Sequence, residues 1–209
     1  MAVVTLDKGK NPKAVVNVDN SLNYQDKEGN LQSKQIKTAI TEIAEEAGKV
    51  TAMGFGAVTM SVKDSEGAYK NYFVNRNENN GTITLVPTDL QDKTDSSQNV
   101  YFNRHSKENN GKNYFFYTLN DKSEAGKAFL ENLSTTEWQD KDGASRSNLE
   151  ARVVLHNPEL VKQLKEKGEN ALAVVSKDNF RITTKEEHFK AKDSTQEKKQ
   201  EAHLDRELC

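Results

Sequence analysis

The chain has 209 residues, of which 34% are hydrophobic and 30% charged, and its formal net charge at pH 7 is -2. This length predicts a single domain with one core. The near-neutral balance excludes the overall basic character that is usual in nucleic-acid-binding domains, so a site of that kind must be a local patch.

The cysteine content and the distribution of apolar residues bear on the compartment. Cys209 is the one cysteine, which excludes a disulfide within the chain. Charged residues follow Met1 too soon for a signal peptide, and no apolar run approaches the roughly 18 residues of a membrane span. We therefore expect a cytoplasmic protein that does not contact membranes.

The first elements differ in their apolar spacing. Short β-branched runs predict strands over residues 2–6 and 14–18. Apolar residues then recur at helical spacing, which predicts a helix over residues 33–47 that Gly48 ends. Period-two alternation follows between residues 50 and 63 and predicts another strand.

A motif then occurs twice, from Tyr72 to Gly81 and from Tyr101 to Gly111. Each copy has a Tyr-Phe pair, an Asn-Arg pair and Glu-Asn-Asn-Gly. Asn-Gly favours a tight hairpin turn, because both residues adopt positive φ at little cost. The motif therefore predicts two similar aromatic hairpins, with strands near residues 69–76, 82–87, 99–105 and 112–119.

The last third of the chain alternates helix and strand signals. The pattern predicts helices over residues 123–133 and from Asn157-Pro158 to Gly168, with strands over residues 151–156, 171–175 and 179–184. These elements make an α+β fold, in which two or three helices pack on an antiparallel sheet of six to eight strands built from hairpins. We expect one domain over residues 1–186 and a flexible charged tail over residues 187–209.

Motifs for nucleotide binding and hydrolysis are incomplete. Gly126-Lys127 lacks the other residues of a phosphate-binding loop, and Gly54-Phe55-Gly56 has Thr59 where a dinucleotide fingerprint needs a third glycine. No paired cysteines or metalloprotease motif occurs. The sequence thus gives no reason to expect a cofactor or a metal.

The two hairpins are the best candidates for a ligand-binding surface. Aromatic side chains on both faces of the strands place rings beside basic residues, a combination that single-stranded nucleic-acid binders use for base stacking and phosphate contact. The candidate ligand-binding residues are Tyr72, Arg76, Tyr101, Arg104, His105 and Lys112. The purely structural alternative is that these residues belong to the core, because aromatic residues are common in the strands of ordinary sheets.

These observations predict a non-enzymatic binding protein with single-stranded nucleic acid as its ligand. One alternative is a protein–protein interaction, or a secreted effector-type protein, that acts through the surface or the tail. A second alternative is an enzyme whose site assembles from dispersed residues, namely Arg76, Arg104, His105 and His156. The sequence leaves the oligomeric state open.

Overall fold

The computed structural model describes residues 1–22, 33–92, 94–177 and 179–190. The strands of the main sheet are β1 (Ala2–Leu6), β2 (Ala14–Val16), β4 (Ala57–Lys63), β5 (Tyr69–Arg76), β6 (Ile83–Pro87), β7 (Val100–Asn109), β8 (Lys112–Leu119), β11 (Ala151–His156), β12 (Ala171–Val175) and β13 (Phe180–Thr184). They form one antiparallel sheet of ten strands in the order β13-β12-β1-β2-β11-β4-β5-β6-β7-β8. The α+β class predicted from the sequence is confirmed, but the sheet is larger than the six to eight strands expected.

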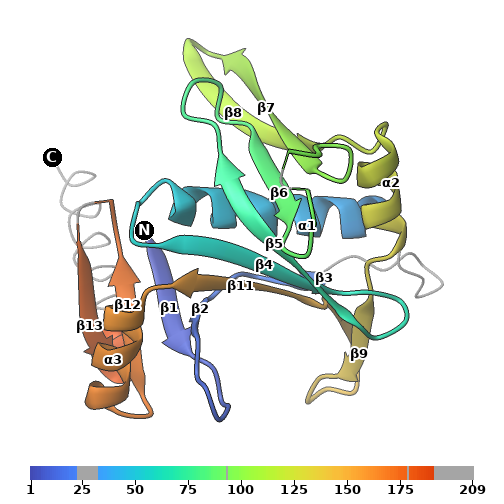
Figure 1. Cartoon of the computed structure of the whole chain (residues 1–209). Helices are drawn as coiled ribbons and strands as arrows, with labels where there is room; N and C mark the ends of the chain where they lie inside the picture. Colours follow the sequence, from blue (N-terminus) through green and yellow to red (C-terminus); the bar gives the residue numbers. More distant parts are fainter. Residues whose placement is uncertain (23–32, 93, 178, 191–209) are drawn as a thin grey trace, which may run out of the picture.

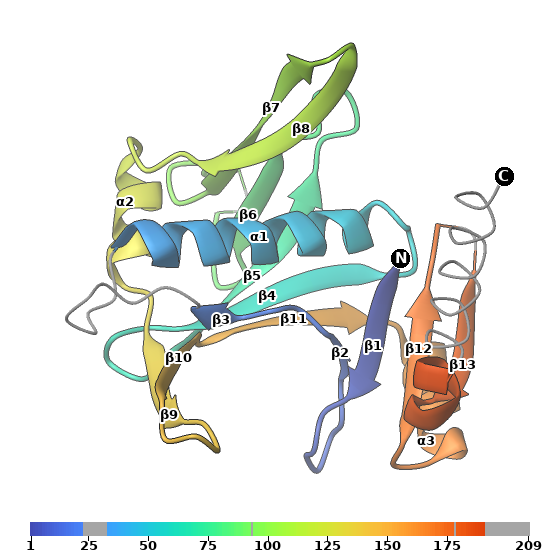
Figure 2. The same ribbon diagram turned by 180° about the vertical axis from the view of Figure 1, so that it is seen from behind.

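The long helix α1 (Ser33–Thr51) lies against the inside of this sheet. Figures 1 and 2 show the sheet bending around α1, with β4 and β11 on one side of the helix and the β7–β8 hairpin on the other. The helix contacts β4, β5, β6, β8 and β11. Its apolar stripe, which includes the fully buried Ile40 and Ala44, therefore forms the centre of the core.

The expectation that Gly48 ends this helix is wrong. The helix continues to Thr51, and Gly54, with φ of 75°, takes the left-handed position after it. A Cβ atom on Gly48 would lie 2.6 Å from Cδ1 of Ile83, so this glycine lets helix and sheet approach closely. Because the helix and the turn after it occupy the residues up to Gly54, the predicted strand starts only at Ala57.

A second, smaller sheet contains β3 (Ser21–Leu22), β9 (Thr135–Gln139) and β10 (Ser145–Leu149), in the order β3-β10-β9. The β9–β10 hairpin falls in a polar stretch for which the sequence predicts no element. Its turn is held by Asp140, whose carboxylate accepts from the backbone N–H groups of Asp142 and Ala144. Polar residues suit this hairpin because most of its side chains are exposed.

Two shorter helices complete the fold. Ser123 caps α2 (Glu124–Glu131), and Asn157 caps α3 (Pro158–Lys167), which ends at Gly168 as predicted. Helix α3 packs on β1, β12 and β13. Residues 185–190 are helical, so part of the predicted tail extends the ordered chain. The rest of that tail, residues 191–209, lies outside the described residues, as do residues 23–32 of the predicted polar loop.

The two aromatic hairpins are present, but their turns differ. Between β7 and β8, Asn110 and Gly111 have φ of 51° and 72°, as the tight Asn-Gly turn requires. Between β5 and β6 the loop is longer, because the last strand pair is Arg76 with Ile83 and only Gly81 has positive φ. The prediction of two equivalent tight turns is therefore wrong for the first copy.

Candidate functional site

The hairpin strands β5 to β8 have one covered face and one open face. Ile83, Leu85 and Phe102 are fully buried on the side of α1, which we call the inner face. Side chains alternate along each strand, so the register fixes the opposite set of residues. We call the opposite side the outer face.

Five aromatic rings lie on the outer face of these four strands, and we call this surface the outer aromatic face. Its rings belong to Tyr69, Phe73, Tyr101, Tyr114 and Phe116. The side chains of Phe73 and Phe116 are each 45% exposed, and that of Tyr114 is 53% exposed. Large rings with this exposure are not part of the core, so the sheet presents them to solvent.

The remaining outward positions of β5 to β8 are basic or neutral. They hold the basic residues His105, Lys107 and Lys112, the amides Asn71, Asn75, Asn103 and Asn109, and also Thr84, Val86 and Thr118. None of these positions, all of which the structure describes, is acidic. The whole chain has 32 Asp and Glu residues. The outer aromatic face is therefore a local basic surface on a chain of slightly negative net charge.

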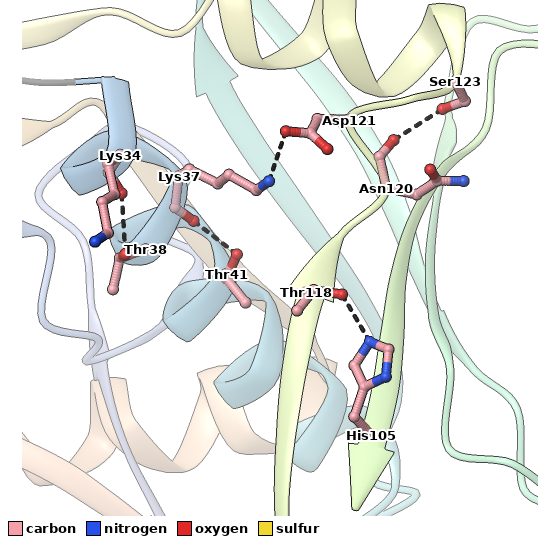
Figure 3. Close-up of polar contacts among 9 residues, drawn as sticks. All are labelled: Lys34, Lys37, Thr38, Thr41, His105, Thr118, Asn120, Asp121 and Ser123. Carbon is pink, nitrogen blue, oxygen red and sulfur yellow. Dashed lines mark hydrogen bonds and ion pairs between the residues drawn. The ribbon is translucent and has the colours of Figure 1, made fainter.

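Two ring contacts involve basic residues at this surface. The ring of His105 stacks on Phe116 at 5.1 Å between centroids, and its Nε2 atom lies 2.8 Å from Oγ1 of Thr118 (Figure 3). At the far end of the face, Nζ of Lys63 lies 6.0 Å from the centre of the Tyr69 ring. Basic residues and rings thus alternate along the outer face.

The β7–β8 hairpin is tied to α1 by an ion pair just after the end of β8. Nζ of Lys37 lies 2.5 Å from Oδ2 of Asp121, just after β8 (Figure 3). The hydrogen bond from Lys37 lowers the pKa of the Asp121 carboxyl below its ordinary value. Since both side chains are partly exposed, this pair contributes little to stability and mainly positions the end of β8.

On the inner face, Arg104 is held by its neighbours in a defined position. Its guanidinium carbon lies 3.6 Å from the centre of the Phe115 ring, a cation–π geometry. On the other side, a Cβ atom on Gly81 would lie 2.6 Å from Cδ of Arg104, and the hydroxyl of Tyr117 donates to the carbonyl of Gly81. Within the described residues, Arg104 makes no ion pair.

Tyr72 and Arg76 also face inward, on β5. Tyr72 is buried and its ring meets Phe129 of α2 edge to face. Burial, with a smaller contribution from the charges of Asp89 and Asp64, raises the pKa of the Tyr72 hydroxyl to about 12. Tyr72 is therefore a core residue at the edge of a cleft of about 450 Å³.

The six candidate residues divide between the two faces. Tyr101, His105 and Lys112 lie on the outer aromatic face, whereas Tyr72, Arg76 and Arg104 lie on the inner face. In the first motif three positions separate Phe73 from Arg76, but in the second only two separate Phe102 from Arg104. Because side chains alternate, both arginines face inward while the Tyr-Phe pairs face opposite ways.

Sequence reasoning missed several outward residues. Lys107 and the outward asparagines were not candidates, although they occupy the same alternate positions as Tyr101 and His105. The sequence signal that could have found them is the two-residue period of a strand. This period identifies the residues of one face only after one of them has been assigned to that face.

The dispersed residues of the alternative enzyme site are not brought together. His156 lies on β11, which is separated from β7 by β4, β5 and β6. Its Nε2 atom is 2.8 Å from Oγ1 of Thr59. Burial, and secondarily the charge of Lys13, lowers the pKa of His156. This histidine therefore has a local structural partner and lies on the opposite face of the sheet from Arg76 and Arg104, although only β4 separates its strand from β5.

The described part of the chain contains no group of three or more His, Cys, Asp or Glu residues placed to hold a metal ion. None of the helices in the described ranges is long and apolar enough to span a membrane.

Comparison with known proteins gives no assignment. No protein-family model matches this chain, and neither a curated protein nor a solved structure is significantly similar to it.

Proposed function

We propose that this protein is a binding protein whose outer aromatic face receives single-stranded nucleic acid. The observation that carries the proposal is the composition of that face, where exposed rings, amides and cations occupy the outward positions of β5 to β8 without an acidic residue. Exposed rings stack on unpaired bases, and lysines contact the phosphates between them.

The amide side chains suit the same ligand. Asn71, Asn75 and Asn103 lie among the rings, and an amide both donates and accepts hydrogen bonds at the edge of a base. A double helix keeps its bases stacked inside, so it cannot use flat rings on an open sheet in this way. The expected preference is therefore for single strands.

The test is binding of a fluorescein-labelled oligothymidylate to the purified full chain, followed by anisotropy at about 50 mM and about 200 mM salt. Replacing both Tyr114 and Phe116 by alanine removes two exposed rings. We expect this variant to bind at least tenfold more weakly, because stacking contributes about 1–3 kcal/mol per base. The double variant Lys107→Ala, Lys112→Ala is expected to reduce the salt dependence of binding.

Two controls test whether the loss of binding is specific to the outer aromatic face. The variant Arg76→Ala, Arg104→Ala removes cations from the inner face and is expected to bind nearly as well as the wild type. Trp138→Ala removes a ring of similar exposure from β9, which belongs to the second sheet and not to the outer aromatic face. Absence of binding at low salt, or greater loss in the arginine variant than in the ring variant, would contradict the proposal.

A further inference from the structure

The two edges of the ten-stranded sheet differ in their protection. At one edge, β13 has five residues, includes the exposed Arg181 and is packed by α3. The helical residues 185–190 follow it directly, and the Glu187 carboxylate accepts from the backbone N–H of Thr184. Short length, charge and a covering helix are common ways in which proteins block an edge strand.

The other edge, β8, is long, has no covering helix among the described residues and carries a charge only at its first residue, Lys112. It has eight residues, and from Asn113 to Asn120 the sequence contains no charged residue and no proline. Its residues from Lys112 to Phe116 are all exposed, and Phe115 is 54% exposed. A long, neutral and aromatic edge strand is a template for another strand.

The register shows which backbone groups of β8 are free. A two-residue turn makes Asn109 and Lys112 a hydrogen-bonded pair. Because hydrogen-bonded and non-hydrogen-bonded pairs alternate along an antiparallel ladder, the backbone groups of every even-numbered residue of β8 bond to β7. The N–H of Asn120 donates to the carbonyl of Tyr101 at 2.8 Å, as this alternation requires. The N–H and C=O groups of Asn113, Phe115 and Tyr117 therefore point away from the sheet.

We propose that a second copy of this chain pairs with β8, strand to strand, about a two-fold axis at Phe115. An antiparallel two-fold pair places Phe115 opposite its own copy and Asn113 opposite Tyr117, so the outward backbone groups of these three residues are used on both chains. Tyr114 then lies opposite Phe116. Aromatic pairs across strands are favourable, and no like charges meet.

Charge favours a copy of this strand over an unrelated charged segment. The free part of β8 offers neither cation nor anion to a charged partner, while its own sequence supplies a neutral strand of matching length. The perpendicular two-fold axis also keeps both outer faces on one side. The pair would therefore join two outer aromatic faces into one surface, although the proposal does not depend on what that surface binds.

The experiment is sedimentation velocity on the full chain over a concentration series, with two opposite substitutions at the axis. Phe115→Lys and Phe115→Glu each place like charges directly opposite one another in a symmetric pair. We expect the wild type to sediment as two chains of 23.5 kDa each. Each variant alone should sediment as one chain, and an equimolar mixture of both should again give pairs.

Recovery in the mixture separates the proposed pairing from misfolding, since unfolded variants would not recover by mixing. The same charge exchange at Phe116 is the matched control, because position 116 lies opposite Tyr114 and not opposite itself. A monomeric wild type at every concentration overturns the proposal and leaves β8 to a different partner. A pair that survives both single variants also overturns it, because the chains then meet elsewhere. Neither outcome depends on nucleic-acid binding.

Discussion

The two aromatic hairpins share a sequence motif but not a structural role. The first, β5–β6, lies in the middle of the sheet over α1, and its Tyr72 is buried against α2. The second, β7–β8, ends the sheet, and its Tyr101 faces outward while Phe102 is fully buried. The repeated motif therefore predicts that a hairpin forms, whereas the helices that pack on the sheet determine which of its rings is buried in the core.

The largest expected effect distinguishes the two phenylalanines of the motif. Phe102→Ala removes a fully buried ring and should lower the free energy of unfolding by about 3–5 kcal/mol. Phe73→Ala removes a ring that is 45% exposed and should lower it by less than about 1 kcal/mol. Urea unfolding of both variants measures the difference. Equal losses would mean that the two motifs are equivalent after all.

A second test compares the turn glycines. Gly81 and Gly111 both have positive φ, so alanine at either should destabilise by about 1–2 kcal/mol. Gly81→Ala should destabilise more, because its Cβ atom would meet Cδ of Arg104, whereas nothing lies within 4 Å of a Cβ atom on Gly111. Thermal unfolding measures both effects.

The excess destabilisation at Gly81 should be relieved by a second substitution. In the background Arg104→Ala the clashing atom is absent, so Gly81→Ala should cost about the same as Gly111→Ala. A double-mutant cycle gives this coupling directly. Independent effects of Gly81→Ala and Arg104→Ala would show that the arginine moves away freely, and that the inner face does not hold it in place.

The last expected effect concerns the buried tyrosine of the first motif and is observed only at high pH. Because its pKa is raised from 10.0 to about 12 in the folded chain, the unfolded chain ionises first. The stabilisation is complete below pH 10 and is lost as the pH rises through about 12. Tyr72→Phe should therefore lose less stability than the wild type across this interval, measured relative to pH 7. Parallel pH profiles would contradict the burial of this hydroxyl.

The sequence predicts the local elements of this fold well. The strands at residues 112–119 and 151–156 and the start and end of α3 agree with the structure, because alternation, capping and turn residues act locally. The β9–β10 hairpin is missed because its exposed strands are polar. Gly48 is misassigned because its role is a contact with Ile83, which is distant in sequence.

The candidate site is only partly predictable for a related reason. The rings and cations of both hairpins can be named from the sequence, but their division between the faces depends on where α1 lies. The shorter Phe-to-Arg spacing of the second motif reverses its Tyr-Phe pair while keeping Arg104 on the same side as Arg76. Local sequence patterns show that side chains alternate between the two faces of a strand, but they do not show which face is buried.

The strand order places β11 between β2 and β4, where Val153 pairs with both Val16 and Met60. During synthesis the β5–β8 hairpins can close as soon as they emerge, since their contacts are local. The centre of the sheet must wait for a strand made much later. Strand β2 pairs with β1 and β4 with β5, but the facing edges of β2 and β4 have no partner until β11 is made. Such distant pairing slows folding and prolongs the exposure of apolar strand edges. A nascent chain that stalls before β11 is therefore an expected substrate for chaperones.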